Sequence, residues 1–232
     1  MSQLFYAPGL PDNQQLPESE SHHIHHVLRK QSGEHIEATD GRGNFYLLRI
    51  VEWQAKRLLV EVIKKWADPS PHEFLILAVA PTKQIDRYEW MVEKCIELGA
   101  TQIIPVVCQR SERRRLRKDR LERIALAAMK QSLHSRLPEI SDLTPFPDLF
   151  HLPLPDNRLI AHCGDGQHQS IERGSGQHIL LVGPEGDFSP EEVKLARENG
   201  FQEVQMGAYR LRTETAALYG AATLGSARSL KK

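Results

Sequence analysis

The sequence has few cysteines and no long apolar run, and both absences limit the kind of protein it can be. Its three cysteines, Cys95, Cys108 and Cys163, lie far apart and form no CxxC pair, which argues against a disulfide framework and against a zinc site. No segment approaches the ~18 consecutive apolar residues of a membrane helix, and the first residues lack the basic-then-apolar pattern of a secretory signal. We therefore expect a cytoplasmic protein without membrane association.

An excess of charge of one sign is also absent. Thirty Lys and Arg residues balance thirty Asp and Glu residues, so any contact with nucleic acid must use a local basic patch. With 232 residues, 40% of them hydrophobic, the chain can bury a substantial core, and it is long enough for one large or two modest domains. No internal repeat or low-complexity tract interrupts it.

The pattern of apolar residues changes near residue 70. Before it, short alternating segments separated by Gly, Asp and Asn turns predict strands over 34–38, 45–51 and 57–63. Asp68-Pro69-Ser70-Pro71 then has two prolines that disfavour regular structure, which predicts a linker. We expect a small β domain over residues 1–70 and a second domain over 71–232.

In the second domain, apolar runs typical of buried strands alternate with segments of helical periodicity. This alternation predicts a parallel α/β sheet with right-handed crossovers. One helix start is especially clear, because Ser189-Pro190-Glu191-Glu192 combines an N-cap serine, a proline in the first turn and a capping-box glutamate. The expected strands are 74–80, 103–107, 158–163, 178–182 and 203–206, and the expected helices cover 85–98, 121–129, 190–199 and 215–227.

Two loops that follow strands concentrate the chemistry. One is the glycine-rich stretch 183–188, and the other is 206–216, between the last strand and the last helix. Ligands bind at this edge of parallel sheets, and glycines let a backbone approach them closely. The first loop has neither a Walker A nor a GxGxxG pattern, which argues against nucleotide hydrolysis and dinucleotide binding. These residues favour a small-molecule site over a purely structural turn, and they leave the reaction open.

Specific residues of these loops resemble a known family. Gly183-Pro184-Glu185-Gly186 and the segment 211–216, Leu-Arg-Thr-Glu-Thr-Ala, are similar to the signature pair of the RsmE methyltransferases, of the SPOUT class. Residues 97–100 (Glu-Leu-Gly-Ala), 109–111 (Gln-Arg-Ser) and 26–29 (His-Val-Leu-Arg) resemble the central and N-terminal blocks of that family, in the same order along the chain. One departure is Asp187, where the family usually carries another glycine.

This resemblance implies a fold, a reaction and partners. The fold would be α/β, a SPOUT-type trefoil-knotted parallel-sheet methyltransferase domain preceded by a small PUA-like, RNA-binding β-barrel. The protein would be a cytoplasmic homodimer that uses S-adenosyl-L-methionine to methylate N3 of a uridine in 16S ribosomal RNA, either free or in the assembled small subunit. The implied cofactor-binding residues are His162, Gly183, Pro184, Glu185, Gly186, Met206, Gly207, Leu211, Thr213, Thr215 and Ala216.

The acceptor nitrogen of uridine poses the main chemical problem, because it carries a proton at neutral pH. A base must remove that proton, or a cation must stabilise the developing anion. Our hypothesis is that Glu185 or Glu214 accepts the proton and that Arg212 stabilises the uracil oxygen. The alternative is structural, with Glu214 complementing the dipole of the last helix and Glu185 orienting its loop.

A basic run over residues 110–120 is the best candidate for RNA contacts, with seven basic side chains against two acidic ones. It could follow a phosphate backbone, although a solvated helix face would look the same in the sequence. The predicted RNA-binding residues are Arg29, Arg110, Arg113, Arg114, Arg115 and Arg136. A catalytically inactive RNA-binding adaptor and a SPOUT enzyme acting on another RNA, such as transfer RNA, remain alternatives.

Two groups of side chains in the first domain allow more than one interpretation. His22, His23, His25 and His26 could converge on a metal, but no carboxylate-supported ligand set accompanies them, so we expect no metal and interpret them as solvated or RNA-facing. Trp53 and Trp66 could stack on bases or pack in the core.

Overall fold

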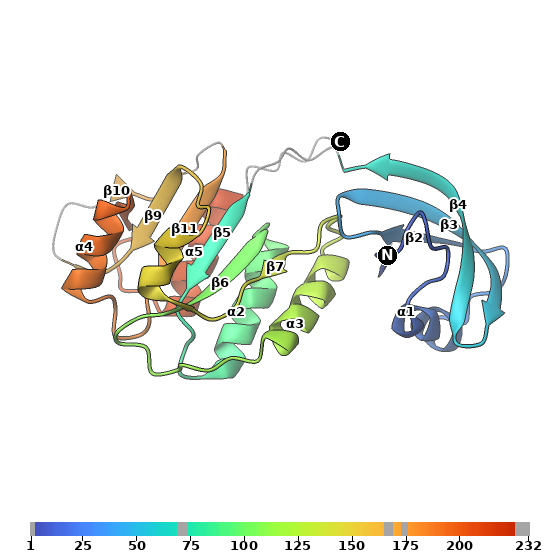
Figure 1. The fold of residues 1–232 in the computed structure, drawn as a ribbon, viewed down its shortest axis with the longest axis horizontal. Coiled ribbons are helices and arrows are strands. Elements are labelled where there is room, and N and C mark those ends of the chain that lie inside the picture. Colours follow the sequence, from blue (N-terminus) through green and yellow to red (C-terminus); the bar gives the residue numbers. More distant parts are fainter. Residues whose placement is uncertain (1–2, 69–73, 165–168, 173–175, 226–232) are drawn as a thin grey trace. The chain divides into compact units, whose positions relative to one another are not determined.

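The protein is described by a computed structural model over residues 3–68, 74–164, 169–172 and 176–225 (Figure 1). The chain divides into two compact units, of which the first comprises Met1–Pro69 and Met129–Leu137 and the second comprises the remainder. Most of the expected linker, from residue 69 onward, lies outside the described residues. Among the helices of these ranges, none has the length and apolar character needed to cross a membrane.

The first unit is built on a four-stranded sheet in the order β1-β2-β3-β4, and residues 14–16 pair with the outer edge of β4 through an antiparallel bridge between Gln15 and Leu59. In β3, Tyr46, Leu48 and Ile50 are buried and alternate with more exposed residues, as a strand with one face on the core requires. β3 and β4 extend beyond the predicted strands. The bounds are β1 Leu4–Tyr6, α1 Glu18–His22, a π-helical turn His23–Val27, β2 His35–Thr39, β3 Asn44–Gln54 and β4 Arg57–Ala67.

The segment Met129–Leu137 belongs to the first unit although the residues on both sides of it belong to the second. It is held by polar contacts, which include hydrogen bonds to the end of β2 and to the turn after it. The Thr39 hydroxyl donates to the Ser135 carbonyl oxygen (2.7 Å), and Leu137 N–H donates to the Gly41 carbonyl oxygen (2.9 Å). Apolar periodicity does not indicate such a return of the chain, because these contacts are made by polar groups of the backbone and side chains.

The second unit is a sheet in which every strand pairing is parallel, as predicted. Its strand order is β10-β12-β9-β11-β5-β6-β7, with β8 pairing with β6 off this path. The strands are β5 Leu75–Val79, β6 Gln102–Val107, β7 Glu139–Ile140, β8 Thr144–Pro145, β9 Asn157–Ala161, β10 Gln169–Ser170, β11 His178–Val182 and β12 Gln202–Gln205.

Successive residues of the central strands contribute to two hydrophobic clusters, one on each face of the sheet. In β11, Leu180 and Val182 belong to the cluster that includes residues of α2, α3 and α5, whereas Ile179 and Leu181 belong to the cluster that includes α4 and a 3₁₀ helix. A strand buried on both faces explains why its sequence is continuously apolar. The helices are α2 Ile85–Glu97, α3 Lys118–Gln131, the 3₁₀ helix Phe146–His151, α4 Pro190–Glu198 and α5 Thr213–Gly225.

The helix ends follow their local signals in α2 and α4. The complete capping box forms at α4, where Glu192 N–H donates to Ser189 Oγ (3.2 Å) and Ser189 N–H donates to Glu192 Oε2 (2.8 Å). Gly99, just beyond α2, has φ +104°, which glycine adopts without strain. The prediction for α5 was wrong by one half-turn, because the helix begins at Thr213 and not at residue 215. Its expected last residues, 226–227, lie outside the described ranges.

Candidate functional site

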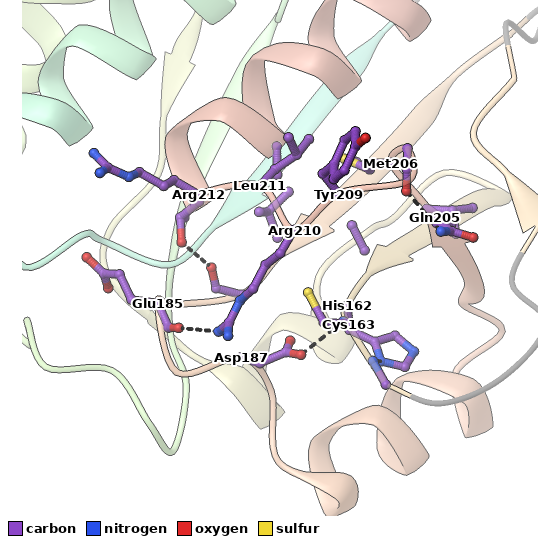
Figure 2. Close-up of a pocket in the computed structure, with 18 of the residues that line it drawn as sticks. His162, Cys163, Glu185, Asp187, Gln205, Met206, Tyr209, Arg210, Leu211 and Arg212 are labelled. Atoms are coloured by element: carbon purple, nitrogen blue, oxygen red, sulfur yellow. Dashed lines mark hydrogen bonds between the residues drawn. The ribbon is translucent and has the colours of Figure 1, made fainter.

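A cavity of about 570 Å³ opens at the carboxyl ends of β9, β11 and β12 (Figure 2). Because these three strands are neighbours in the sheet, the loops after them meet at one edge. We call residues 183–188 the GPEG loop and residues 206–212 the RLR loop. The wall consists of Ala161, His162, Cys163, Gly164, Val182, Gly183, Pro184, Glu185, Asp187, Val204, Gln205, Met206, Gly207, Ala208, Tyr209, Arg210, Leu211, Arg212, Thr213 and Ala216.

Both predicted loops therefore meet at one cavity, as do most of the residues expected there. Gly186 and Thr215 are exceptions and do not line it. The Gly186 backbone instead faces Arg110, and Thr215 is exposed on the first turn of α5. The predicted residues that line the cavity are His162, Gly183, Pro184, Glu185, Met206, Gly207, Leu211, Arg212, Thr213 and Ala216.

Side chains and amides from other loops hold the GPEG loop in place. The Thr213 hydroxyl donates to the Gly183 carbonyl oxygen (2.9 Å), and an Arg210 Nη2–H donates to the Glu185 carbonyl oxygen (3.1 Å). The Glu185 carboxylate accepts from Lys83 N–H (2.8 Å). Glu185 is thus oriented by the backbone of another loop, as the structural alternative expects, while its side chain remains exposed at the cavity.

Asp187 occupies a backbone conformation that explains why glycine is usual at this position in the family that the sequence resembles. Its φ of +62° lies in the left-handed region, which aspartate tolerates better than most residues because its side chain can bond to nearby backbone. Asp187 Oδ1 accepts from Phe188 N–H (2.8 Å), and Oδ2 accepts from Cys163 N–H (2.9 Å). The carboxylate therefore joins the loop after β11 to the loop after β9.

His162 is fixed by a chain of polar contacts behind the cavity wall. Its Nδ1 accepts from Gly164 N–H (3.0 Å), so Nε2 carries the proton that is shared with Glu203 Oε2 (2.5 Å). The hydrogen bond from Arg197, with that from His162, holds the pKa of Glu203 below its usual value. An ionised Glu203 thereby sets the orientation of the His162 ring at the cavity.

The three predicted catalytic residues do not lie together. Arg212 is exposed at the cavity and its guanidinium has no partner among the described residues, whereas Glu214 is only 8% exposed and does not line the cavity. The Glu214 carboxylate pairs with Arg87 of α2 (3.5 Å) in the first turn of α5. This geometry favours the structural interpretation of Glu214. In Figure 2, Arg212 and Glu185 lie on one side of the cavity, and His162 and Cys163 lie on the other.

Several residues of the wall were not predicted. Cys163 and Gly164 follow β9, and the sequence does not show that β9 lies between β11 and β12 in the sheet. Tyr209, in the RLR loop, is 87% exposed at the cavity. Most of the missed residues lie in the loops directly after the three strands, and counting every residue of those loops as part of the site would have included them. They are Cys163, Gly164, Asp187, Ala208, Tyr209 and Arg210. The other missed residues belong to the ends of the strands themselves, so their position in the sequence does not mark them as part of a site. They are Ala161, Val182, Val204 and Gln205.

The arginines predicted to bind RNA have different environments. Arg110 and Arg113 donate to backbone carbonyl oxygens, of Gly186 and Phe188 in the first case and of Thr82 and Lys83 in the second. Arg114 donates to the Gln109 carbonyl oxygen (3.1 Å), and the Arg115 side chain has no hydrogen-bonding partner in the described ranges. Arg29 and Arg136, in the first unit, are exposed.

The histidines of the first unit form an aromatic cluster. The His25 ring stacks on Trp53 with centroids 4.5 Å apart, and His22 and His26 are 4.6 Å apart. Within the ranges that the structure describes, no group of three or more His, Cys, Asp or Glu side chains could hold a metal ion. Trp53 packs against the core of this unit, and Trp66 stacks on Phe45 with centroids 5.7 Å apart.

The cavity suits a compact ligand with both apolar and charged parts. Its volume falls within the range of about 300–1,000 Å³ that is typical of small-molecule sites. Val182, Val204 and Leu211 provide apolar walls, while two carboxylates, of Glu185 and Asp187, and two guanidiniums, of Arg210 and Arg212, provide charge of both signs. Apart from the two chain neighbours of Gly207, no atom of the described residues lies within 4 Å of the position that a Cβ would take there, so a ligand can approach the backbone. S-adenosylmethionine, with its apolar ring faces, sulfonium and ammonium, fits these features.

Comparison with known proteins shows which family the chain resembles. The family model described as RNA methyltransferase domain matches residues 68–225, and the model described as RNA methyltransferase PUA domain matches residues 16–63. A probable rRNA-methyltransferase from Porphyromonas gingivalis is 40% identical, with a TM-score of 0.86 over 94% of this chain and 95% of that chain. Ribosomal RNA small subunit methyltransferase E from Neisseria gonorrhoeae, solved with S-adenosyl methionine, is 29% identical, with a TM-score of 0.79 over 96% of each chain.

A curated relative extends this similarity. Ribosomal RNA small subunit methyltransferase E from Rickettsia conorii is 25% identical over 228 residues, which cover 94% of this chain and 92% of that protein. The chain therefore belongs to the RNA methyltransferase family with a PUA domain that includes Ribosomal RNA small subunit methyltransferase E.

Proposed function

We propose that this protein uses S-adenosylmethionine to methylate N3 of a uridine in the 16S ribosomal RNA of the small subunit. The observation that carries the proposal is the cavity lined by both the GPEG and the RLR loops, which include residues of the two segments that resemble the RsmE signature. Two of the named relatives are small-subunit ribosomal RNA methyltransferases, and one of these was solved with this cofactor.

The cavity residues divide the work of the reaction. When bound, S-adenosylmethionine supplies a methyl group on a positively charged sulfur, already activated for displacement. The apolar walls and the backbone of the loops around the cavity, open to a ligand at Gly207, would hold the cofactor and exclude water. Arg212, exposed at the cavity, would stabilise the negative charge that develops on a uracil oxygen as N3 loses its proton. Glu185, whose second carboxylate oxygen has no hydrogen-bonding partner among the described residues, would accept that proton.

The assignment of Glu185 predicts a change in the pH–rate profile. In Glu185→Gln, the side-chain amide oxygen can still accept the hydrogen bond from Lys83 N–H. The amide is not basic, however, and cannot take up the proton from N3. We expect its single-turnover rate at neutral pH to fall about 10²-fold or more, within the range for general-base catalysis, and to recover as pH rises. Glu214→Gln is the matched control, because Glu214 does not line the cavity. A wild-type rate for Glu185→Gln would exclude it as the base.

The test of the whole proposal uses the proposed substrate directly. Small subunits that lack uridine methylation are incubated with the protein and labelled S-adenosylmethionine, and the modified base is identified by mass spectrometry. We expect label at N3 of one uridine in 16S ribosomal RNA. Label on transfer RNA, or at another base, would indicate a related enzyme, and binding to RNA without cofactor-induced stabilisation would indicate an adaptor. The same assay with free RNA decides which form is the substrate.

Cysteine labelling tests the cofactor cavity without the reaction. Cys163 is exposed and lines the cavity, whereas burial raises the pKa of Cys95 to about 12 and also raises that of Cys108. We expect a thiol reagent to modify one thiol per native chain and S-adenosylmethionine to slow this modification. Cys163→Ser should abolish the fast labelling. A labelling rate unaffected by saturating cofactor would contradict the proposed position of the ligand.

For the RNA, we propose contacts by exposed arginines of both units. Arg114 and Arg115 would meet phosphates beside the cavity unit, and Arg29 and Arg136 would do so in the first unit. Replacing both Arg114 and Arg115 by Gln should reduce the slope of log affinity against log salt by about 1.4, or about 0.7 for each single-strand phosphate that the protein no longer neutralises. A slope equal to that of the wild type would exclude this pair.

Three further properties are proposed from the family. They are a trefoil knot around the cofactor, a homodimer and a cytoplasmic location. We also propose that the domain boundary near residue 70 separates a PUA-like RNA-binding domain from the methyltransferase domain, with Met129–Leu137 completing the former.

A further inference from the structure

We propose that Arg113 is a positioning residue that holds the GPEG loop through Lys83 and Glu185, and that it is not an RNA contact. This inference goes beyond the proposed function and rests on it only for the predicted effect on cofactor affinity. It reassigns one of the arginines that the basic run 110–120 had suggested for phosphate binding. The basis for it is a relay of hydrogen bonds across three neighbouring loops of the sheet.

The relay begins in the loop between β6 and α3. Arg113 Nε–H donates to the Thr82 carbonyl oxygen (3.1 Å), and an Nη2–H donates to the Lys83 carbonyl oxygen (2.7 Å). Both acceptors lie in the loop between β5 and α2. A guanidinium that bonds two successive carbonyl oxygens in a planar fork fixes the intervening peptide and therefore the direction of nearby amides.

The second step of the relay joins that loop to the GPEG loop. Lys83 N–H donates to Glu185 Oε1 (2.8 Å), so the position of the Glu185 carboxylate depends on the orientation of the Lys83 amide. Since β11, β5 and β6 are adjacent in the sheet, the relay crosses the three loops in their spatial order. The Lys83 side chain is occupied separately, in an ion pair with Glu112 (2.9 Å).

Arg110 adds a direct connection between the outer two of these loops. Its Nη1–H groups donate to the carbonyl oxygens of Gly186 (2.9 Å) and Phe188 (3.1 Å), on either side of Asp187. The loop after β6 therefore holds the GPEG loop at two points, through Arg110 directly and through Arg113 by the relay. The backbone carbonyls of these loops lie beyond the strand ends, so neighbouring strands do not supply their hydrogen-bond donors. The guanidiniums of Arg110 and Arg113 supply donors instead, and these charge-assisted hydrogen bonds restrain the loops.

Arg115 provides the contrast within the same basic run. It is exposed, and among the described residues its side chain has no hydrogen-bonding partner. A phosphate can reach such a guanidinium without breaking internal bonds, whereas at Arg113 it would compete with two carbonyl oxygens. Arg115→Gln is therefore the matched control for Arg113→Gln, since the two substitutions remove the same charge two residues apart.

The first measurement needs no ligand and no activity. Amide hydrogen exchange of the cofactor-free protein is compared among wild type, Arg113→Gln and Arg115→Gln. We expect exchange of the Lys83 amide and of residues 183–188 to be about tenfold faster in Arg113→Gln, the effect expected when a charge-assisted hydrogen bond that restrains the loop is removed. Arg115→Gln should exchange like the wild type. Unchanged exchange in Arg113→Gln would overturn the proposal.

The second measurement tests the route of the effect. We expect Arg113→Gln to weaken S-adenosylmethionine binding about tenfold, leaving the salt slope of RNA binding unchanged, and Arg115→Gln to do the reverse. In a Glu185→Ala background, which removes the acceptor, Arg113→Gln should have little further effect, because the two residues act in one relay. Arg113→Lys, with a single ammonium, should restore affinity only in part.

The outcomes separate this inference from the proposed function. Additive losses in the Glu185→Ala background, or a reduced salt slope for Arg113→Gln, would contradict the relay. A wild-type protein that binds no S-adenosylmethionine would contradict the proposed function instead, and the exchange measurement would still decide whether Arg113 holds the loop.

Discussion

Replacing Arg212 by glutamine is expected to lower the rate of methyl transfer by about 10²-fold to 10³-fold, the usual effect of removing one preorganised donor from a developing anion. Arg212 is exposed at the cavity, and its guanidinium has no partner in the described part of the chain. Its loss should therefore not loosen the fold. The rate is measured in a single turnover with saturating cofactor and RNA, and cofactor affinity is measured separately.

The control for Arg212 lies two residues earlier in the same loop. Arg210 donates to the Glu185 carbonyl oxygen, so Arg210→Gln should loosen the GPEG loop and weaken cofactor binding more than it slows the bound complex. Arg212→Gln should have the opposite effect, in which the rate of methyl transfer falls and the affinity for the cofactor is nearly unchanged. If Arg212→Gln instead weakens cofactor binding and transfers the methyl group at the wild-type rate, its role is binding and not stabilisation of the anion.

Gly225→Ala is expected to lower the free energy of unfolding by about 2–3 kcal/mol and Tm by roughly 5–10 °C. A Cβ built on Gly225 would lie 2.2 Å from the Leu98 carbonyl oxygen at the end of α2, which is far inside contact distance. Because the obstacle is backbone, no side-chain rotation relieves it. Gly220 has a similar role one and a half turns earlier, where a Cβ would lie 2.1 Å from Leu180 Cδ2 in β11.

The stability measurement needs a control on the same helix. Ala222 is exposed in α5, so Ala222→Ser should change the free energy of unfolding by no more than about 0.5 kcal/mol. Thermal unfolding monitored by circular dichroism is sufficient for the comparison. A Gly225→Ala protein as stable as the control would mean that α2 and α5 do not approach each other as closely as the structure indicates.

The elements predicted most accurately are those whose signals are local. β11 is a five-residue run without a polar interruption after His178, and α4 has a complete capping box, so both were placed correctly. The short strands β7, β8 and β10 have two residues each, which is too few to show any periodicity. The start of α5 was misplaced because Thr213 and Glu214, assigned to the loop, already form the first helical turn.

The limits of the site prediction have a different physical cause. The two loops carry recognisable residues, but the third wall, after β9, depends on the strand order β12-β9-β11, which no local pattern encodes. Charge is similarly ambiguous, since an arginine that donates to a carbonyl oxygen and one that faces a phosphate look the same in a sequence. Arg113 donates to two carbonyl oxygens, whereas Arg115, two residues later, is exposed and has no hydrogen-bonding partner among the described residues.

The return of Met129–Leu137 to the first unit has a consequence for biosynthesis. The hydroxyl of Thr39 and the carbonyl of Gly41 meet their partners only when residues 135–137 have been synthesised. The N-terminal unit therefore cannot complete its native hydrogen bonds while the nascent chain is shorter than that. A gene fragment that ends near residue 70 would therefore encode the first unit without the segment Met129–Leu137.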